Sequence, residues 1–207
     1  MAEELEVRRG GADAPATLKA QAEAQVAATL EQRAALELAE APPGMGQWEV
    51  WARGPWQAPG QMPGRIIELG QTAFIATVVW LDDVMLANVV GFEGKIELRY
   101  HTSNTQTMAS VPAMAFACSI TPRANQHYYV TVWEFQPTEA GCVLETNICA
   151  RICNCKNHTV PGYAAFVRWV RDFDVDSLFP PVPWGFDRPI RYMVYDPRIE
   201  CVGDPCP

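Results

Sequence analysis

The chain has 207 residues, of which 49% are hydrophobic, and its net charge at pH 7 is -8. This length and apolar content suffice for one folded domain with a tail, without support from metal ions or disulfides. The acidic balance excludes a protein that holds nucleic acid through an extended basic surface, because phosphate binding requires clustered Lys and Arg.

The segment that comes nearest to a membrane span covers residues 72–92, and it carries Asp82 and Asp83 in its middle. Charges at that position are costly in lipid, so no membrane insertion is expected. The first eleven residues are charged rather than apolar, which argues against a secretory signal. We therefore expect a soluble protein made in a reducing compartment, where most of the 7 cysteines stay free thiols.

Residues 1–45 are predicted to form an N-terminal arm, disordered over residues 1–14 and helical from Pro15 to about Glu40. The helical part is rich in Ala, Gln and Glu, and its apolar residues recur every four positions: Leu18, Ala22, Val26 and Leu30. So thin an apolar stripe makes a helix that is marginal alone and requires a surface to pack on. A Pro-Pro-Gly sequence at residues 42–44 ends the helix.

Residues 46–196 contain a series of short strand signals, in which runs of Val, Ile, Phe, Tyr and Trp are interrupted by Gly, Pro, Asn or Asp. The predicted strands cover residues 65–69, 72–80, 84–90, 95–100, 111–120, 128–135, 142–152, 163–173 and 190–195. A hairpin turn is expected at residues 138–141, and the 163–173 segment also fits helical spacing. Together these signals predict an all-β antiparallel sandwich, followed by an irregular tail at residues 197–207.

One cluster has the residue types of a metal site. Cys149, Cys153, Cys155 and His158 place three thiols and an imidazole within ten residues, and such groups bind zinc in a tetrahedral arrangement. The spacing differs from that of zinc knuckles, because three residues and then one residue separate the cysteines. In an extended segment the thiols would lie on one sheet face but far apart, so buried or idle thiols are the favoured interpretation and no cofactor is predicted.

Tryptophans give a second set of candidates, this time for protein interfaces: Trp48, Trp51, Trp56 and Trp184. The first three cluster ahead of the strands, and the fourth lies in a Pro-rich loop. Indoles in loops often fill the pocket of a neighbouring protein, although they can equally cap the ends of a sandwich. The chain has no phosphate loop, no nucleophile elbow and no zinc-protease motif, so no enzymatic activity and no catalytic residue are predicted.

Three segments resemble parts of picorna-like virus coat proteins. Phe92-Glu-Gly-Lys-Ile-Glu-Leu-Arg-Tyr100 resembles the strand after their short connecting helix, and Tyr128–Phe135 followed by Cys142–Thr146 resembles their next hairpin. Residues 167–184 are similar to the final strand and Pro-rich exit of small coat proteins in the secovirus group of plant viruses. The likeness covers roughly residues 66–195 and rests on strand patterns rather than catalytic signatures.

The resemblance implies a jelly roll of about eight strands and a mechanical function. Such subunits assemble with other coat subunits into an icosahedral shell around single-stranded RNA, with many modest interfaces. The expected location is then the virion, assembled in the host cytoplasm. Since the arm is acidic, any contact with genomic RNA is expected to be weak.

Two other interpretations of the chain remain open. The first is a START-like helix-grip module that binds a hydrophobic ligand, in which residues 161–173 would form a last helix across a curved sheet. The second is an accessory subunit of a large protein complex, in which residues 15–40 would form the docking helix. A strand at residues 163–173 favours the coat protein, and a helix there favours the ligand binder.

Overall fold

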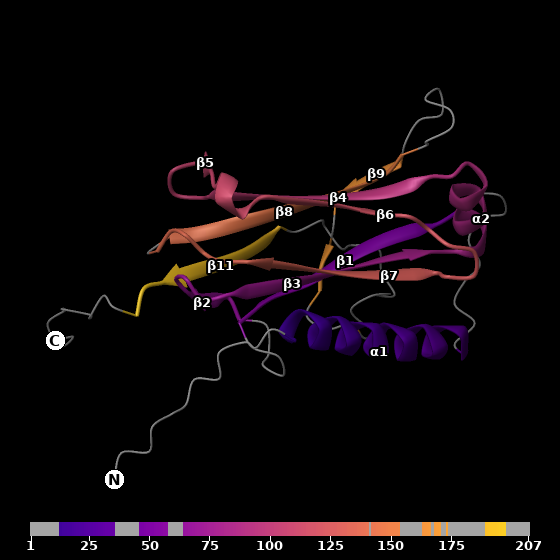
Figure 1. The fold of residues 1–207 in the computed structure, drawn as a ribbon, viewed down its shortest axis with the longest axis horizontal. Coiled ribbons are helices and arrows are strands. Elements are labelled where there is room, and N and C mark those ends of the chain that lie inside the picture. Colours follow the sequence, from indigo (N-terminus) through magenta and orange to yellow (C-terminus); the bar gives the residue numbers. More distant parts are fainter. Residues whose placement is uncertain are drawn as a thin grey trace, which may run out of the picture.

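The computed structural model describes residues 13–35, 46–57, 64–140, 142–153, 163–166, 168–170, 173 and 189–197 of the chain. Three layers are stacked in this part of the molecule: the helix α1 (Ala14–Ala35), a four-stranded sheet A and a seven-stranded sheet B. Figure 1 shows α1 running along sheet A, with sheet B on the other side of that sheet. The helix expected within residues 15–40 is therefore confirmed over its described part.

Sheet A has the order β10-β1-β3-β7, formed by Arg168–Trp169, Trp48–Trp56, Ala73–Leu81 and Tyr128–Phe135. Its long strands are antiparallel, and β10 joins β1 in parallel. The strand β1 had no predicted counterpart, because the Gly54-Pro55 pair has the composition of a loop. The chain accommodates this pair through a register shift between Arg53 and Trp56, which restores pairing with β3.

Sheet B has the order β2-β11-β8-β4-β5, formed by Ile66–Glu68, Ile190–Tyr195, Cys142–Cys153, Lys95–Asn104 and Ala109–Ser110. Two further strands, β6 (Phe116–Ile120) and β9 (Tyr163–Phe166), pair with β4 and β8. The pairing of β8 with β9 confirms a strand in the first part of the ambiguous 163–173 segment. In β4 and β8 buried side chains alternate strictly with half-buried or exposed ones, as expected for strands with one buried face.

The predicted all-β sandwich is confirmed, whereas its predicted jelly-roll connectivity is not. A jelly roll places most consecutive strands in opposite sheets, but here β1 pairs with β3, β4 with β6 and β8 with β11. The described strands instead follow the immunoglobulin-like order, with β1, β3 and β7 as strands A, B and E. In the same scheme β4, β6, β8 and β11 correspond to strands C, C′, F and G.

The strand predicted at residues 84–90 is wrong, because this segment forms the helix α2 (Asp83–Gly91). Its N-cap is Asp82, whose carboxylate accepts hydrogen bonds from the backbone N–H groups of Met85 and Gln47, both at 2.7 Å. An Asp that satisfies the first free N–H groups favours helix initiation, and Met85, Leu86 and Val89 then fall on one buried face. The Asp82-Asp83 pair thus begins a helix.

Two further predictions require correction. The predicted β7–β8 hairpin is wrong, because β7 lies in sheet A and β8 in sheet B. The strand expected at residues 111–120 begins only at Phe116, after a short 3-10 turn at Pro112–Met114. The strand β6 lies at the edge of sheet B, and its side chains are alternately half-buried and exposed.

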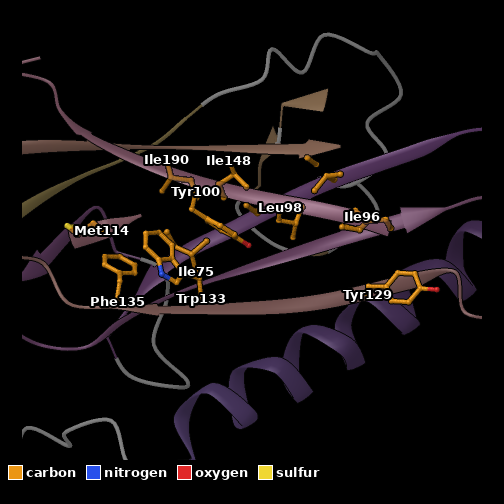
Figure 2. Packing of buried hydrophobic residues seen from close by; sticks show 14 of the residues in the cluster. Ile75, Ile96, Leu98, Tyr100, Met114, Tyr129, Trp133, Phe135, Ile148 and Ile190 are labelled. Atoms are coloured by element: carbon orange, nitrogen blue, oxygen red, sulfur yellow. The ribbon is translucent and has the colours of Figure 1, made fainter. Parts of the chain in front are cut away.

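The main core lies between the two sheets and contains a connected group of aromatic rings. Trp133 of β7 is within 5.0 Å of the Tyr100 ring and 4.5 Å of the Phe135 ring, measured between centroids. Figure 2 shows these side chains together with Ile75, Leu98 and Ile148 from both sheets. Aromatic contacts of this kind add to the stabilisation from burial, so they hold the two sheets together.

Polar groups in the main core are matched across neighbouring strands of sheet B. Thr146 of β8 contacts the hydroxyl of Thr102 at 2.9 Å and that of Tyr192 at 3.0 Å. Burial raises the pKa of Tyr192 to about 12, so its hydroxyl stays protonated and can take part in this chain. Because buried hydroxyls are costly when unpaired, the chain favours the observed register of β4, β8 and β11.

Candidate interaction face

The candidate site is the outer side of sheet B. It consists of the odd-numbered residues of β4, β6, β8 and β11, together with Ile66 and Glu68 of β2, and we call it the outer face of sheet B. No described element packs over it, whereas α1 covers the corresponding face of sheet A. Two kinds of group occupy this face: exposed apolar side chains and ion-paired charges.

The apolar group lies where β2, β11 and β8 adjoin. Ile66 and Met193 are register partners in the parallel pair β2–β11, and Val143 is the partner of Met193 in the antiparallel pair β8–β11. Tyr195 follows two residues after Met193 on the same face. Ile66, Met193 and Tyr195 are exposed, so apolar side chains from neighbouring strands are presented together to solvent.

The charged group lies on the central strands β4, β8 and β11. The Glu97 carboxylate accepts from Arg151 Nε at 2.7 Å and is 3.5 Å from the Arg99 guanidinium. Arg191 Nε donates to Glu145 at 2.7 Å. The hydrogen bond from Arg151 lowers the pKa of Glu97, which keeps this carboxylate ionised at neutral pH.

The cations of these pairs are more exposed than the carboxylates. The side chain of Arg191 is 65% exposed against 19% for Glu145, and that of Arg151 is 50% exposed against 31% for Glu97. The carboxylates therefore lie closer to the sheet, and the guanidinium groups lie outermost. A molecule that approaches this face meets Arg, Tyr and Met side chains, which are enriched in the cores of protein interfaces.

The cysteine cluster is only partly described, because Cys155 and His158 lie outside the described residues. Cys149 and Cys153 both belong to β8 and share the outer face, four residues apart. At the rise of a β-strand this spacing is about 13 Å, which is too long for two thiolates to bind the same ion. The described residues contain no group of three or more His, Cys, Asp or Glu side chains placed to hold a metal.

The thiols in the described strands have the properties of structural rather than reactive cysteines. Burial raises the pKa of Cys149, and it also raises the pKa of Cys118, which faces the core from β6. A raised pKa keeps a thiol protonated at neutral pH, and the protonated form is a poor nucleophile and a poor metal ligand. For the complete cluster of Cys149, Cys153, Cys155 and His158, the interpretation as buried or idle thiols stays a prediction.

Two of the three tryptophans of β1 are buried within the chain itself. Trp51 and Trp56 are buried in a second core between sheet A and α1, and Trp48 is half-buried against the main core. The prediction of an interface role is wrong for Trp51 and Trp56, because the helix of the same chain covers them. Trp184 lies outside the described residues, so its predicted role stays a prediction.

The residues of the outer face were not singled out from the sequence, although one signal for them was present. The alternation of Lys95, Glu97 and Arg99 with buried Ile96 and Leu98 identifies a solvated strand face. It does not show that Arg151 and Arg191 lie on the same surface, because this depends on which strands are neighbours. The apolar group requires the parallel β2–β11 pair, which joins residues more than 120 positions apart.

Comparison with known proteins adds little to this description. No protein-family model and no curated protein matches the chain. Among solved structures, a CARDB domain from Pyrococcus furiosus in complex with di-metal ions is 13% identical, with 65% of this chain and 97% of that chain covered and a TM-score of 0.31. A beta-glucosidase from Listeria innocua in complex with gluconolactone is 10% identical, and the match spans 59% of this chain but 16% of that enzyme, with a TM-score of 0.30.

These similarities are too low to support any argument about function. The candidate site therefore rests on the geometry of the chain itself. None of the helices in the described ranges combines the length and hydropathy required to cross a bilayer.

Proposed function

We propose that this chain is a non-catalytic structural subunit that assembles with further copies of itself through the outer face of sheet B. The observation that carries the proposal is the asymmetry of the sandwich. One face is covered by α1 with apolar contacts, and the other presents Ile66, Met193 and Tyr195 next to exposed arginines. Clustered apolar side chains beside polar and charged groups are a typical arrangement at protein interfaces.

The alternatives are less well supported by the same geometry. A helix-grip ligand binder needs a helix across the sheet near residues 161–173, where β9 and β10 lie instead. An accessory subunit that docks through α1 needs a free apolar stripe on that helix. Leu18, Ala22 and Val26 already pack against sheet A of the same chain, so the stripe is occupied.

A viral coat subunit is the more specific form of the assembly proposal. It is favoured by the position of the short helix α2 directly before β4, the arrangement on which the resemblance of residues 92–100 depends. The strand order argues for an immunoglobulin-like rather than a jelly-roll subunit, so we propose assembly as the function and a shell around RNA as its second, narrower candidate. Negative-stain microscopy of particles purified from the natural source of the protein tests the narrower candidate. RNA-containing particles support it, and their absence contradicts it.

The central test is the effect of the outer face on assembly of the full chain. We expect wild type to form assemblies larger than its 23.0 kDa monomer, measured by size-exclusion chromatography with light scattering across micromolar concentrations. Met193→Asp should weaken assembly by more than about tenfold in dissociation constant, because it places a charge within the apolar group.

The matched control is Met108→Asp, which changes an exposed Met in the turn between β4 and β5, outside the face. This variant should assemble like wild type. A wild-type chain that stays monomeric at all concentrations contradicts the proposed function. So does equal weakening by the two variants.

A further inference from the structure

We infer that the contact between copies is heterologous: the outer face of sheet B in one copy binds an acidic surface elsewhere on the next copy. This inference rests on the proposed function and specifies its geometry. It concerns the charges of the face, whereas the proposed function concerns its apolar group. The type of contact also determines how assemblies grow, because heterologous contacts form rings, shells or filaments, while a two-fold contact closes at a dimer.

The first argument is the difference in charge between this face and the rest of the chain. The face carries a net charge of +1, because it has four cationic and three anionic side chains: Lys95, Arg99, Arg151 and Arg191, and Glu68, Glu97 and Glu145. Since the whole chain carries -8, all other residues together carry -9. The described residues outside the face carry six Lys and Arg against ten Asp and Glu, so a second copy of the chain supplies an excess of carboxylates that can pair with this face.

The second argument is the depth at which the charges lie. Glu145 and Glu97 already pair with Arg191 and Arg151, and they are the less exposed partners. A guanidinium nitrogen of Arg99 lies 3.5 Å from the Glu97 carboxylate, compared with 2.6 Å for a guanidinium nitrogen of Arg151. Two guanidinium groups thus share Glu97, and this part of the face retains an excess of outward positive charge.

These positions also argue against a face-to-face dimer. A two-fold axis would bring the exposed guanidinium groups of one copy toward the equivalent positive face of the other. Of the three carboxylates on the face, Glu97 and Glu145 lie beneath the cations and pair with them, and Glu68 accepts a hydrogen bond from the Tyr195 hydroxyl. Repulsion between like charges at an interface disfavours such pairing, whereas an acidic surface of the next copy supplies the missing partners.

A mixing experiment distinguishes the two kinds of contact. The Met193→Asp variant has a damaged face but keeps the acidic remainder, so in a heterologous assembly it still accepts the face of a wild-type copy. Added in small amounts with a tag, it should enter wild-type assemblies and reduce their mean mass by terminating growth. If the tagged variant does not enter the wild-type assemblies and their mean mass is unchanged, the inference is overturned. The proposed function would remain intact.

A charge exchange tests the electrostatic part separately. The double variant Glu145→Arg/Arg191→Glu keeps the ion pair and the net charge, but it moves the carboxylate to the outer position. We expect at least about tenfold weaker assembly in 50 mM salt, and a steep loss of wild-type assembly between 50 and 500 mM.

The matched control is Lys19→Glu/Glu23→Lys, which exchanges an exposed i,i+4 pair on α1, remote from the face. The exchange on the helix should leave assembly unchanged. Wild-type assembly that is insensitive to salt and to the Glu145–Arg191 exchange would contradict the inference, and circular dichroism would confirm that each variant is folded.

Discussion

The outer faces of the two sheets differ, although both sheets are mainly antiparallel and belong to one sandwich. On sheet A, Trp51, Phe74 and Val78 point outward and are buried, because α1 lies over them. On sheet B, outward positions of β4 and β8 alternate with core positions and hold Glu97, Arg99 and other polar residues. The difference shows that a strand buried on both faces requires a third layer, and only sheet A has one among the described elements.

This contrast also explains the sequence of β3. Its residues are almost continuously apolar, from Ala73 to Leu81, because one side meets the main core and the other meets the helix. In β4 the period-two alternation indicates that only one side is covered. The two strands thus carry different hydrophobic patterns because they belong to different layers.

The largest expected effect is the removal of an aromatic side chain from the covered face. Trp51→Ala should lower the free energy of unfolding by about 3–5 kcal/mol, because it leaves a cavity between sheet A and α1. The same truncation on the uncovered face, Tyr195→Ala, should cost less than about 1 kcal/mol, because Tyr195 is exposed. Urea unfolding measures both variants, and similar losses would contradict the distinction between the faces.

A smaller effect is expected when the helix alone is released from sheet A. Val26→Asp places a carboxylate in the buried stripe of α1, so we expect α1 to become sensitive to proteolysis while the sandwich stays folded. Ala24→Asp changes an exposed position of the same helix and is the control. Limited proteolysis followed by mass spectrometry checks the result, and equal protection of α1 in both variants would contradict its packing on sheet A.

The smallest effect is expected for the ion pairs of the uncovered face. Arg151→Ala should change the free energy of unfolding only slightly, since exposed pairs are screened by solvent. Because the native pKa of Glu97 lies below its unfolded value, the pair stabilises the fold at neutral pH. This contribution is lost as the pH falls through the native pKa.

Unfolding curves at pH 7 and pH 3 measure this effect. Wild type and Arg151→Ala should differ in stability at pH 7, and this difference should shrink as the pH is lowered. A difference that grows as the pH falls would show that the sign assigned to the linkage is wrong.

The sequence by itself determined that the chain is a β-sandwich preceded by a helix, because strand and helix periodicities are local properties. Lys95–Tyr100 alternates and Leu18, Ala22 and Val26 recur every four residues, and both patterns formed the predicted elements. Predictions from local sequence patterns were wrong where a helix cap or a backbone irregularity had more influence on the structure than residue composition. Asp82 initiates a helix in a Val-rich segment, and β1 continues through Gly54-Pro55.

The tertiary structure decided which strands are neighbours, and with them the order of the sheets and the candidate site. The parallel β2–β11 pair joins Ile66 to Met193, and the β8–β11 pair joins Glu145 to Arg191. It also decided that Trp51 and Trp56 are buried under α1 instead of serving an interface. The physical reason is that burial depends on what covers a residue, and the covering elements are remote in sequence.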